Sequence, residues 1–195
     1  MSLIAFEGLD QSGKETQARL LRARLEAAGH RVETLTFPDD STPLGQDIRA
    51  ALAGRREYAR DVMQLLYIAN RHERREDIES WLDDGVVVIC DRYIASSIAY
   101  GEAQGLDAAW LTDVQRKLPQ PALTILLDIA PATALARKRS NRDRYESDME
   151  LLARVRDSYR KLAQQPTWAL IDGEHTREAV AEEINALVAT RLALP

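Results

Sequence analysis

A glycine-rich segment that ends in a lysine could hold a phosphate. Residues 8–16 read Gly-Leu-Asp-Gln-Ser-Gly-Lys-Glu-Thr, which fits the G-x-x-x-x-G-K pattern. Such a segment wraps backbone N–H groups around a phosphate, sets the positive end of the next helix against it and brings the lysine, here Lys14, to the transferred group. An apolar run precedes the segment and a helical pattern follows it, so a turn that binds nothing is the weaker interpretation.

The position after Lys14 departs from the common pattern. A Ser or Thr there usually ligates Mg²⁺, whereas this chain has Glu15. Thr16 is turned by about 100° around the helix and does not simply substitute. Either Glu15 lies near the metal without binding it, or its carboxylate meets Mg²⁺ directly or through water. We favour the contact through water.

A second candidate site follows the apolar run at 86–90, where Asp91, Arg92 and Tyr93 come directly after it. A carboxylate that organises a metal belongs at a strand end beside a phosphate loop, and the forked donors of an arginine suit a phosphate. An ion pair between Asp91 and an arginine is the alternative. The expected position at the carboxyl edge of a sheet favours the functional role.

Two further segments add aromatic and cationic side chains. Tyr67 and Arg71 are four residues apart on a helical pattern, so a ring that stacks on a base and a guanidinium that binds its carbonyl or a phosphate can reach one cleft. They could also simply pack against each other. Five of the eight residues at 137–144 are basic, which predicts a lid at approximately 137–146 that covers phosphates and supplies positive charge. A solvated, charged helix end is the alternative.

Short apolar runs and long helical patterns alternate along the chain, and these elements must position the candidate residues. Several runs are apolar at nearly every residue, as in a parallel sheet that is covered on both faces. The alternation predicts a single α/β domain, 1–195, with right-handed crossovers and ligands at the carboxyl ends of the strands. We expect strands at 3–6, 32–37, 86–90, 123–129 and 168–171, and helices at 14–28, 44–53, 60–83, 107–118, 132–139, 147–164 and 176–192.

The composition excludes several classes of partner. The chain has 26 Lys+Arg and 31 Asp+Glu, a formal net charge of −5, so a general binder of nucleic acid or of membrane surfaces is not expected. No apolar run approaches the roughly 20 residues of a membrane span. The single cysteine, Cys90, cannot form an internal disulfide and is expected in the core. With no basic and apolar leader pattern at the start, we expect a cytoplasmic protein.

Taken together and in order, these segments resemble the thymidylate kinases, the dTMP kinases of the P-loop nucleoside monophosphate kinase group. The family has a P-loop NTPase-type fold with a five-stranded parallel sheet and helices on both faces, and its members are usually homodimers. The matching segments are GLDQSGKETQ at 8–17, Phe-Pro-Asp at 37–39 leading to Thr-Pro-Leu-Gly at 42–45, LLYIANR at 65–71, DRYIASSIAY at 91–100, DRYE at 143–146 and Ile-Asp-Gly at 171–173.

The resemblance implies a role for each matching residue. ATP would be bound by Gly8, Gln11, Ser12, Gly13, Lys14, Glu15 and Thr16 of the loop, with Asp172 and Gly173 beside the adenine, and Mg²⁺ by Glu15 and Asp91. The acceptor would be bound by Asp10, Phe37, Tyr67, Arg71, Arg92, Ser96 and Tyr100. Catalysis would fall to Lys14, Asp10 and Arg92, together with Arg139, Arg142 and Arg144 of the lid.

Three features depart from the family's pattern. Besides Glu15, the turn after Phe37-Pro38 reads Asp39-Asp40 where the family often has an Arg for the acceptor phosphate, and Gly101 stands where it often has a Gln. Gln11 in the loop and arginines in the lid resemble the type, common in bacteria, whose catalytic arginine lies in the lid.

The sequence therefore predicts a kinase that transfers the γ-phosphoryl group of ATP to dTMP, giving dTDP and ADP, in dTTP biosynthesis. The expected partners are ATP, dTMP and a second copy of the chain, with no nucleic acid and no membrane. Two alternatives stay open. One is a kinase for another pyrimidine nucleotide or a nucleoside, such as dUMP. The other is a non-catalytic ATP-binding regulatory protein that has lost its metal ligand at position 15.

Overall fold

The sheet is built from short apolar strands. The computed structural model describes residues 2–137 and 148–194. Within these residues the strands pair in parallel in the order β2-β3-β1-β4-β5, which confirms the predicted five-stranded α/β fold. β1, β3 and β4 are buried along their whole length, which explains why their sequences are apolar at nearly every position. The bounds are β1 Ser2–Glu7, β2 Val32–Thr36, β3 Val87–Asp91, β4 Leu123–Asp128 and β5 Trp168–Asp172.

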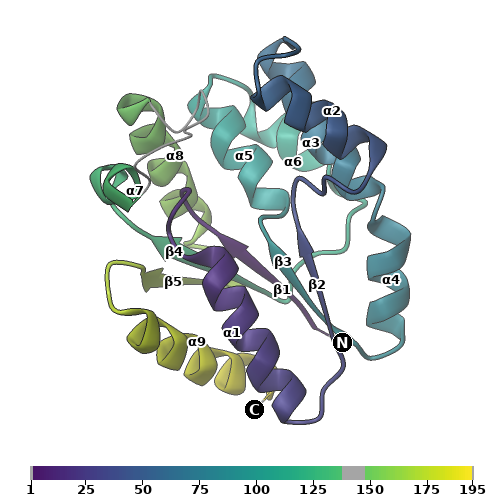
Figure 1. The fold of residues 1–195 in the computed structure, drawn as a ribbon, viewed down its shortest axis with the longest axis vertical. Coiled ribbons are helices and arrows are strands. Elements are labelled where there is room, and N and C mark those ends of the chain that lie inside the picture. The colour runs from purple at the N-terminus through teal and green to yellow at the C-terminus, as the bar shows by residue number, and fades with distance from the viewer. Residues whose placement is uncertain (1, 138–147, 195) are drawn as a thin grey trace.

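Helices connect these strands and cover the sheet on both sides (Figure 1). Several begin at a side chain that accepts a hydrogen bond from the first turn, as Thr42, Asp107, Asp148 and Thr176 do. Among the described residues, no helix is both long and apolar enough to cross a bilayer. The bounds are α1 Lys14–Ala27, α2 Pro43–Leu52, α3 Arg60–His72, α4 Arg75–Asp83, α5 Ile94–Ala103, α6 Ala108–Asp113, α7 Pro131–Arg137, α8 Met149–Leu162 and α9 Arg177–Leu192.

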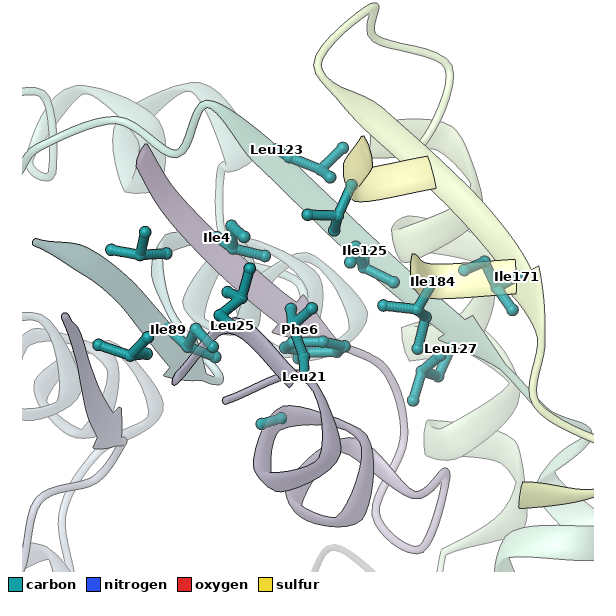
Figure 2. Close-up of a cluster of buried hydrophobic side chains, with 14 of the residues drawn as sticks. Ile4, Phe6, Leu21, Leu25, Ile89, Leu123, Ile125, Leu127, Ile171 and Ile184 are labelled. Atoms are coloured by element: carbon teal, nitrogen blue, oxygen red, sulfur yellow. The ribbon is translucent and has the colours of Figure 1, made fainter. Parts of the chain in front are cut away.

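One face of the sheet packs on α1 and α9. Ile4 and Phe6 of β1 belong to this core together with Leu21 of α1 and Ile184 of α9 (Figure 2). Each of these four side chains is at most 1% exposed. This core holds α1 against the central strand, and α1 is the helix that follows the candidate phosphate loop.

The other face packs on further helices in two clusters. Ala5, Val88 and Cys90 pack with side chains of α3, α4, α5 and α6, while Leu126 packs with α5, α7 and α8. Cys90 is buried, as expected from its apolar surroundings in the sequence. The helix α5 is therefore enclosed between its neighbours, and it is the element that carries Ser96 and Tyr100.

Two of the expected helices are wrong in extent, and one was not predicted. The pattern at 60–83 is not one helix, because the chain breaks between α3 and α4, where Arg74 bonds to Asp39 of a distant loop. The expected helix at 107–118 ends at Asp113. The helix α5 was missed because it is buried on nearly all sides and so lacks an amphipathic period.

Candidate active site

The loop after β1 begins at a glycine that its surroundings require. Gly8 has a φ of 139°, and a Cβ at this position would lie 2.5 Å from the carbonyl oxygen of Leu127 on β4. Gly13 has a φ of 98° and caps the N-terminus of α1. The two glycines let the chain turn from the central strand into α1, so the positive end of that helix lies at the loop. The segment thus has the strand–loop–helix geometry of a phosphate-binding loop.

Lys14 is folded into this loop. Its side chain is in the first turn of α1, is 6% exposed and donates hydrogen bonds to the carbonyl oxygens of Gly8 at 3.2 Å and Leu9 at 2.8 Å. Burial, and then the charge of Arg92, lower the pKa of Lys14 to about 8, against the opposing effect of nearby carboxylates. An anion in the loop would favour the charged ammonium, so a bound polyphosphate and Lys14 would stabilise each other.

A cavity of about 140 Å³ opens beside the loop. Its wall includes the residues that follow the carboxyl ends of β1, β2 and β3, as expected for a parallel sheet. All seven residues predicted to bind the acceptor line this one cavity. The lining residues are Asp10, Phe37, Pro38, Leu52, Gln64, Tyr67, Arg71, Arg92, Ser96, Ser97, Tyr100 and Gln104.

Arg92 is the cation nearest the loop side of this cavity. It is in the left-handed region, with a φ of 64°. Its Nη2 lies 2.6 Å from Oδ1 of Asp10, and its guanidinium lies 5.5 Å from the centre of the Tyr100 ring. Burial alone would lower the pKa of Arg92, but Asp10 and then Tyr100 raise it well above its usual value. A permanently charged, forked donor is therefore fixed between loop and cavity.

Arg71 is the second cation of the cavity and is 3% exposed. One amino group, Nη1, donates to Oγ of Ser97 at 2.8 Å and to Oε1 of Gln115 at 3.1 Å. Burial lowers the pKa of Arg71, and Glu7 is the first of the groups that oppose this shift. The two hydrogen bonds fix the orientation of the guanidinium at the wall of the cavity.

A buried carboxylate that the sequence analysis did not single out supports this wall. Glu7, the last residue of β1, has no exposed surface. Its Oε1 accepts from the backbone N–H of Tyr93 at 2.8 Å and of Ser96 at 3.2 Å, and its Oε2 from Oγ of Ser96 at 2.6 Å and the hydroxyl of Tyr159 at 2.9 Å. Glu7 therefore holds the start of α5 directly after Arg92. A charged residue at the end of an apolar strand was the available signal.

Asp91 lies beside the phosphate loop and is 9% exposed. Its Oδ1 is buried without a hydrogen-bond partner among the described residues, and so is Oγ of Ser12 in the loop. Burial raises the pKa of Asp91, against Lys14 and Arg92, while Glu7 and the exposed Glu15 raise it further. No cluster of three His, Cys, Asp or Glu side chains suited to a metal occurs within 2–137 and 148–194. A cation here would need oxygens from a ligand.

The loop after β5 lies beside the loop that follows β1. The backbone N–H of Gly173 bonds to the carbonyl oxygen of Asp128 at 2.9 Å, and Asp172 accepts from the N–H of Glu174 at 2.9 Å. Arg137, at the end of α7, donates to the carbonyl oxygen of Gln11 at 3.1 Å and to that of Gly173 at 2.9 Å. Arg137 thus joins the phosphate loop to the loop predicted to border the adenine.

Asp39 stands apart from the acceptor cavity. Its Oδ2 lies 2.6 Å from Nε of Arg74, and its backbone N–H bonds to Oδ1 of Asn70 at 2.8 Å. Burial alone would raise the pKa of Asp39, but hydrogen bonds from Ser41 and Arg74 lower it. Asp39, the first residue of the Asp-Asp pair, therefore connects the loop after β2 to the start of α4.

The structure brings together most of the predicted site and adds residues to it. The predicted lid arginines Arg139, Arg142 and Arg144 lie outside the described residues. Gln64 and Gln104 were missed as cavity residues, although Gln64 shares a helix face with Tyr67 and Arg71. Tyr159 was also missed, because it comes from α8, far along the chain from its partners.

A parallel sheet with a phosphate loop after its central strand and a cation-lined cavity beside that loop defines a P-loop phosphotransferase for a small anionic acceptor. Comparison with known proteins gives its family. The family model for thymidylate kinase matches residues 6–184. The chain therefore belongs to the thymidylate kinase family, whose members are nucleoside monophosphate kinases, and the predicted resemblance and kinase class are confirmed. Membership also implies ATP as the phosphoryl donor.

Individual relatives agree with this assignment. The human thymidylate kinase is 34% identical and is matched over 95% of this chain and 89% of its own length. A probable thymidylate kinase of Thermococcus kodakarensis is 38% identical, over 97% of this chain and 98% of its own. The solved thymidylate kinase of Candida albicans, an enzyme with broad substrate specificity, superposes with a TM-score of 0.86 at 30% identity, over 97% of this chain and 91% of that one.

Proposed function

We propose that this protein transfers the γ-phosphoryl group of ATP to dTMP, giving dTDP and ADP, as a step of dTTP biosynthesis. The observation that carries the proposal is the ion pair of 2.6 Å between Asp10 of the phosphate loop and Arg92 of the cavity wall. It places a loop suited to ATP and a cavity suited to a nucleotide against each other. Family membership supports the choice of nucleotides.

The proposed roles follow from where the side chains lie. Lys14 and the loop amides bind the ATP phosphates, and Arg92 binds the acceptor phosphate and orients it toward the donor. Tyr67 and Phe37 enclose the base, and Ser96 and Tyr100 line the cavity near the sugar. No general base is needed, because the acceptor phosphate is already anionic at neutral pH. The lid arginines Arg139, Arg142 and Arg144 stay predicted sources of positive charge.

Mg²⁺ is part of the proposal, and the residues present fit it. The unpaired Oδ1 of Asp91 and the carboxylate of Glu15 are hard oxygen donors beside the loop. Mg²⁺ commonly uses one or two carboxylates together with phosphate oxygens and water, and it would neutralise charge on the transferred group. We expect Glu15→Ala to alter turnover and its dependence on Mg²⁺ concentration. If both were unchanged, the metal role of Glu15 would be abandoned.

A coupled assay of ADP release tests the reaction. The purified protein is given ATP, Mg²⁺ and, in separate reactions, dTMP, dUMP, dCMP and thymidine. We expect the highest kcat/KM with dTMP. A preference for dUMP or for thymidine would replace the proposed acceptor, and ATP binding without turnover of any acceptor would favour the non-catalytic alternative.

We also propose that residues 1–195 act as one domain and that two copies form a homodimer in the cytoplasm. One sheet carries both sides of the site, which supports a single domain. Val62 and Leu65, three residues apart on α3, are 40% and 41% exposed, and two large apolar side chains on one helix face suit a contact with a second copy. Sedimentation of the protein at micromolar concentration tests the dimer, and a monomer would contradict it.

A further inference from the structure

Two glutamines of the acceptor cavity have buried side-chain amide atoms without hydrogen-bond partners. Gln64, on α3, is 1% exposed, and its Oε1 is buried with no hydrogen bond. Gln104, the residue that ends α5, has both Oε1 and Nε2 buried and unpaired. These statements hold for the part of the chain that the structure describes. Both residues line the cavity.

Unpaired buried amides are rare, because each gives up its hydrogen bonds to water and receives nothing in return. Three such atoms around one cavity therefore suggest a partner that enters it. Nε of Arg71 belongs to the same set, since it is also buried and unpaired while Nη1 of Arg71 bonds to Ser97 and Gln115. The wall thus offers a fixed donor, an acceptor on Gln64, and a donor and an acceptor on Gln104.

We propose that Gln64 and Gln104 bind the polar edge of the acceptor base and determine which pyrimidine is accepted. The inference rests on the proposed function, because it requires the acceptor nucleotide to occupy this cavity. A 4-keto pyrimidine presents a carbonyl, an N–H and a second carbonyl along this edge. Two donors and one acceptor from Arg71 and the two glutamines complement it, with Arg71 limited to donation and each amide able to turn.

The same set disfavours an amino pyrimidine. Cytosine has an amino donor in place of the first carbonyl and an acceptor in place of the N–H. The guanidinium of Arg71 cannot turn to accept, because Ser97 and Gln115 fix it and it has no acceptor atom. Thymine and uracil share the keto edge, so the two glutamines separate both of them from cytosine and do not separate them from each other.

The test uses Gln64→Leu and Gln104→Leu, which keep approximate side-chain size and remove hydrogen bonding. In each variant the KM for dTMP should rise about three- to tenfold, the value expected for one lost neutral hydrogen bond, while the KM for ATP stays unchanged. The ratio of kcat/KM for dTMP over dCMP should fall by a similar factor. The Tm should stay level or rise, because an unpaired buried amide has been replaced by an apolar group.

A matched control separates this role from a structural one. Gln17 of α1 also has a buried, unpaired Oε1 but does not line the cavity, so Gln17→Leu should leave the KM for dTMP unchanged. If Gln64→Leu and Gln104→Leu lower the Tm and reduce turnover of dTMP and dCMP in equal proportion, the glutamines are structural and the inference is wrong. It is also wrong if the KM for dTMP does not change.

The wild-type protein distinguishes failure of the inference from failure of the proposed function. Titration of wild-type protein and variants with dTMP by calorimetry measures the dissociation constant without any turnover. If the wild type binds dTMP but has no kinase activity, the proposed reaction fails, and the change in the variants' dissociation constants still decides the role of the glutamines. If the wild type does not bind dTMP, both are overturned.

Discussion

Replacing Glu7 by Gln should destabilise the fold and weaken acceptor binding together. The carboxylate of Glu7 has no exposed surface and accepts four hydrogen bonds, two on each oxygen, from Tyr93, Ser96 and Tyr159. Glu7→Gln keeps the shape of the side chain and changes one carboxylate oxygen to an NH₂ group. Two of the four groups that donate to Glu7 then face this NH₂, which is itself a donor.

The size of the effect follows from which donors can adapt. The two backbone N–H groups cannot reorient, so the new NH₂ must face the hydroxyls of Ser96 and Tyr159. Those hydroxyls accept from Nη1 of Arg92, at 3.2 Å and 3.5 Å, while they donate to Glu7. If they turn to accept from Gln, one hydroxyl can donate to the other across 3.0 Å, but the remaining hydrogen points toward Nη1 of Arg92, so that hydroxyl and the N–H that faces it both lose a partner. At about 1–3 kcal/mol for each unsatisfied buried group, the free energy of unfolding should fall by roughly 2–4 kcal/mol.

Thermal unfolding and steady-state kinetics measure the two consequences. The Tm of Glu7→Gln should fall by roughly 5–15 °C for a chain of this size. The KM for dTMP should rise about three- to tenfold through Arg92, with a smaller change in the KM for ATP. Tyr159→Phe removes a single donor and should lower stability by only about 1 kcal/mol. A larger loss in Tyr159→Phe than in Glu7→Gln, or no change in either quantity for Glu7→Gln, would refute the reasoning.

Two further predictions concern the frame of the site. Gly8→Ala should lower the Tm more than Gly13→Ala. Both positions have positive φ, which costs a side chain about 1–3 kcal/mol, but only at Gly8 would the Cβ also meet a backbone oxygen, at 2.5 Å. Equal losses of Tm in the two variants would contradict the loop geometry. Burial alone would raise the pKa of Asp128, but hydrogen bonds from Arg156 and Arg160 lower it below the ordinary value of 3.8. The ionised Asp128 therefore stabilises the fold at any pH above 3.8, and this stabilisation is lost as the pH falls through the lower pKa of the folded state. Asp128→Asn should therefore lower the free energy of unfolding at pH 7. The loss should be about 1–2 kcal/mol, because the arginines are 25% and 50% exposed and solvent screens their charge. In urea denaturation at a series of pH values, the free energy of unfolding of the variant should fall less steeply than that of the wild type at acid pH.

The sequence sufficed for the sheet and for the position of the glycine-rich loop after its central strand. The apolar run at 86–90 is buried along its whole length. The glycines at 8 and 13 take the positive φ angles that the loop between β1 and α1 requires. The signals that failed were those set by tertiary contacts. The break between α3 and α4 has no glycine or proline, and Arg74 at the break bonds to Asp39 of a loop that is distant in the sequence. The helix α5 has no amphipathic period because the core surrounds it.

The predicted site was incomplete for the same reason. Arg92 and Asp10 could be identified from motifs, since each follows a strand end in the sequence. Glu7 and Tyr159 contact residues that are far from them in the sequence, so no local pattern connects them to these partners. Gln104 directly follows α5, the helix that was not predicted. Gln64 could have been predicted from the sequence, because it shares a helix face with Tyr67 and Arg71. It is an uncharged polar residue on that face, with no ring to stack on a base.

The proposed donor and acceptor sides of the site are joined at the end of a single strand. β1 ends in Glu7, which holds the backbone just after Arg92, and the loop that follows carries Asp10, which pairs with the same arginine. Transfer in line requires the two phosphates to keep a fixed relation. Because β1 is the central strand and is buried along its length, that relation is set by the packed core. A change at Glu7 should therefore reach the acceptor through Arg92 before it reaches ATP.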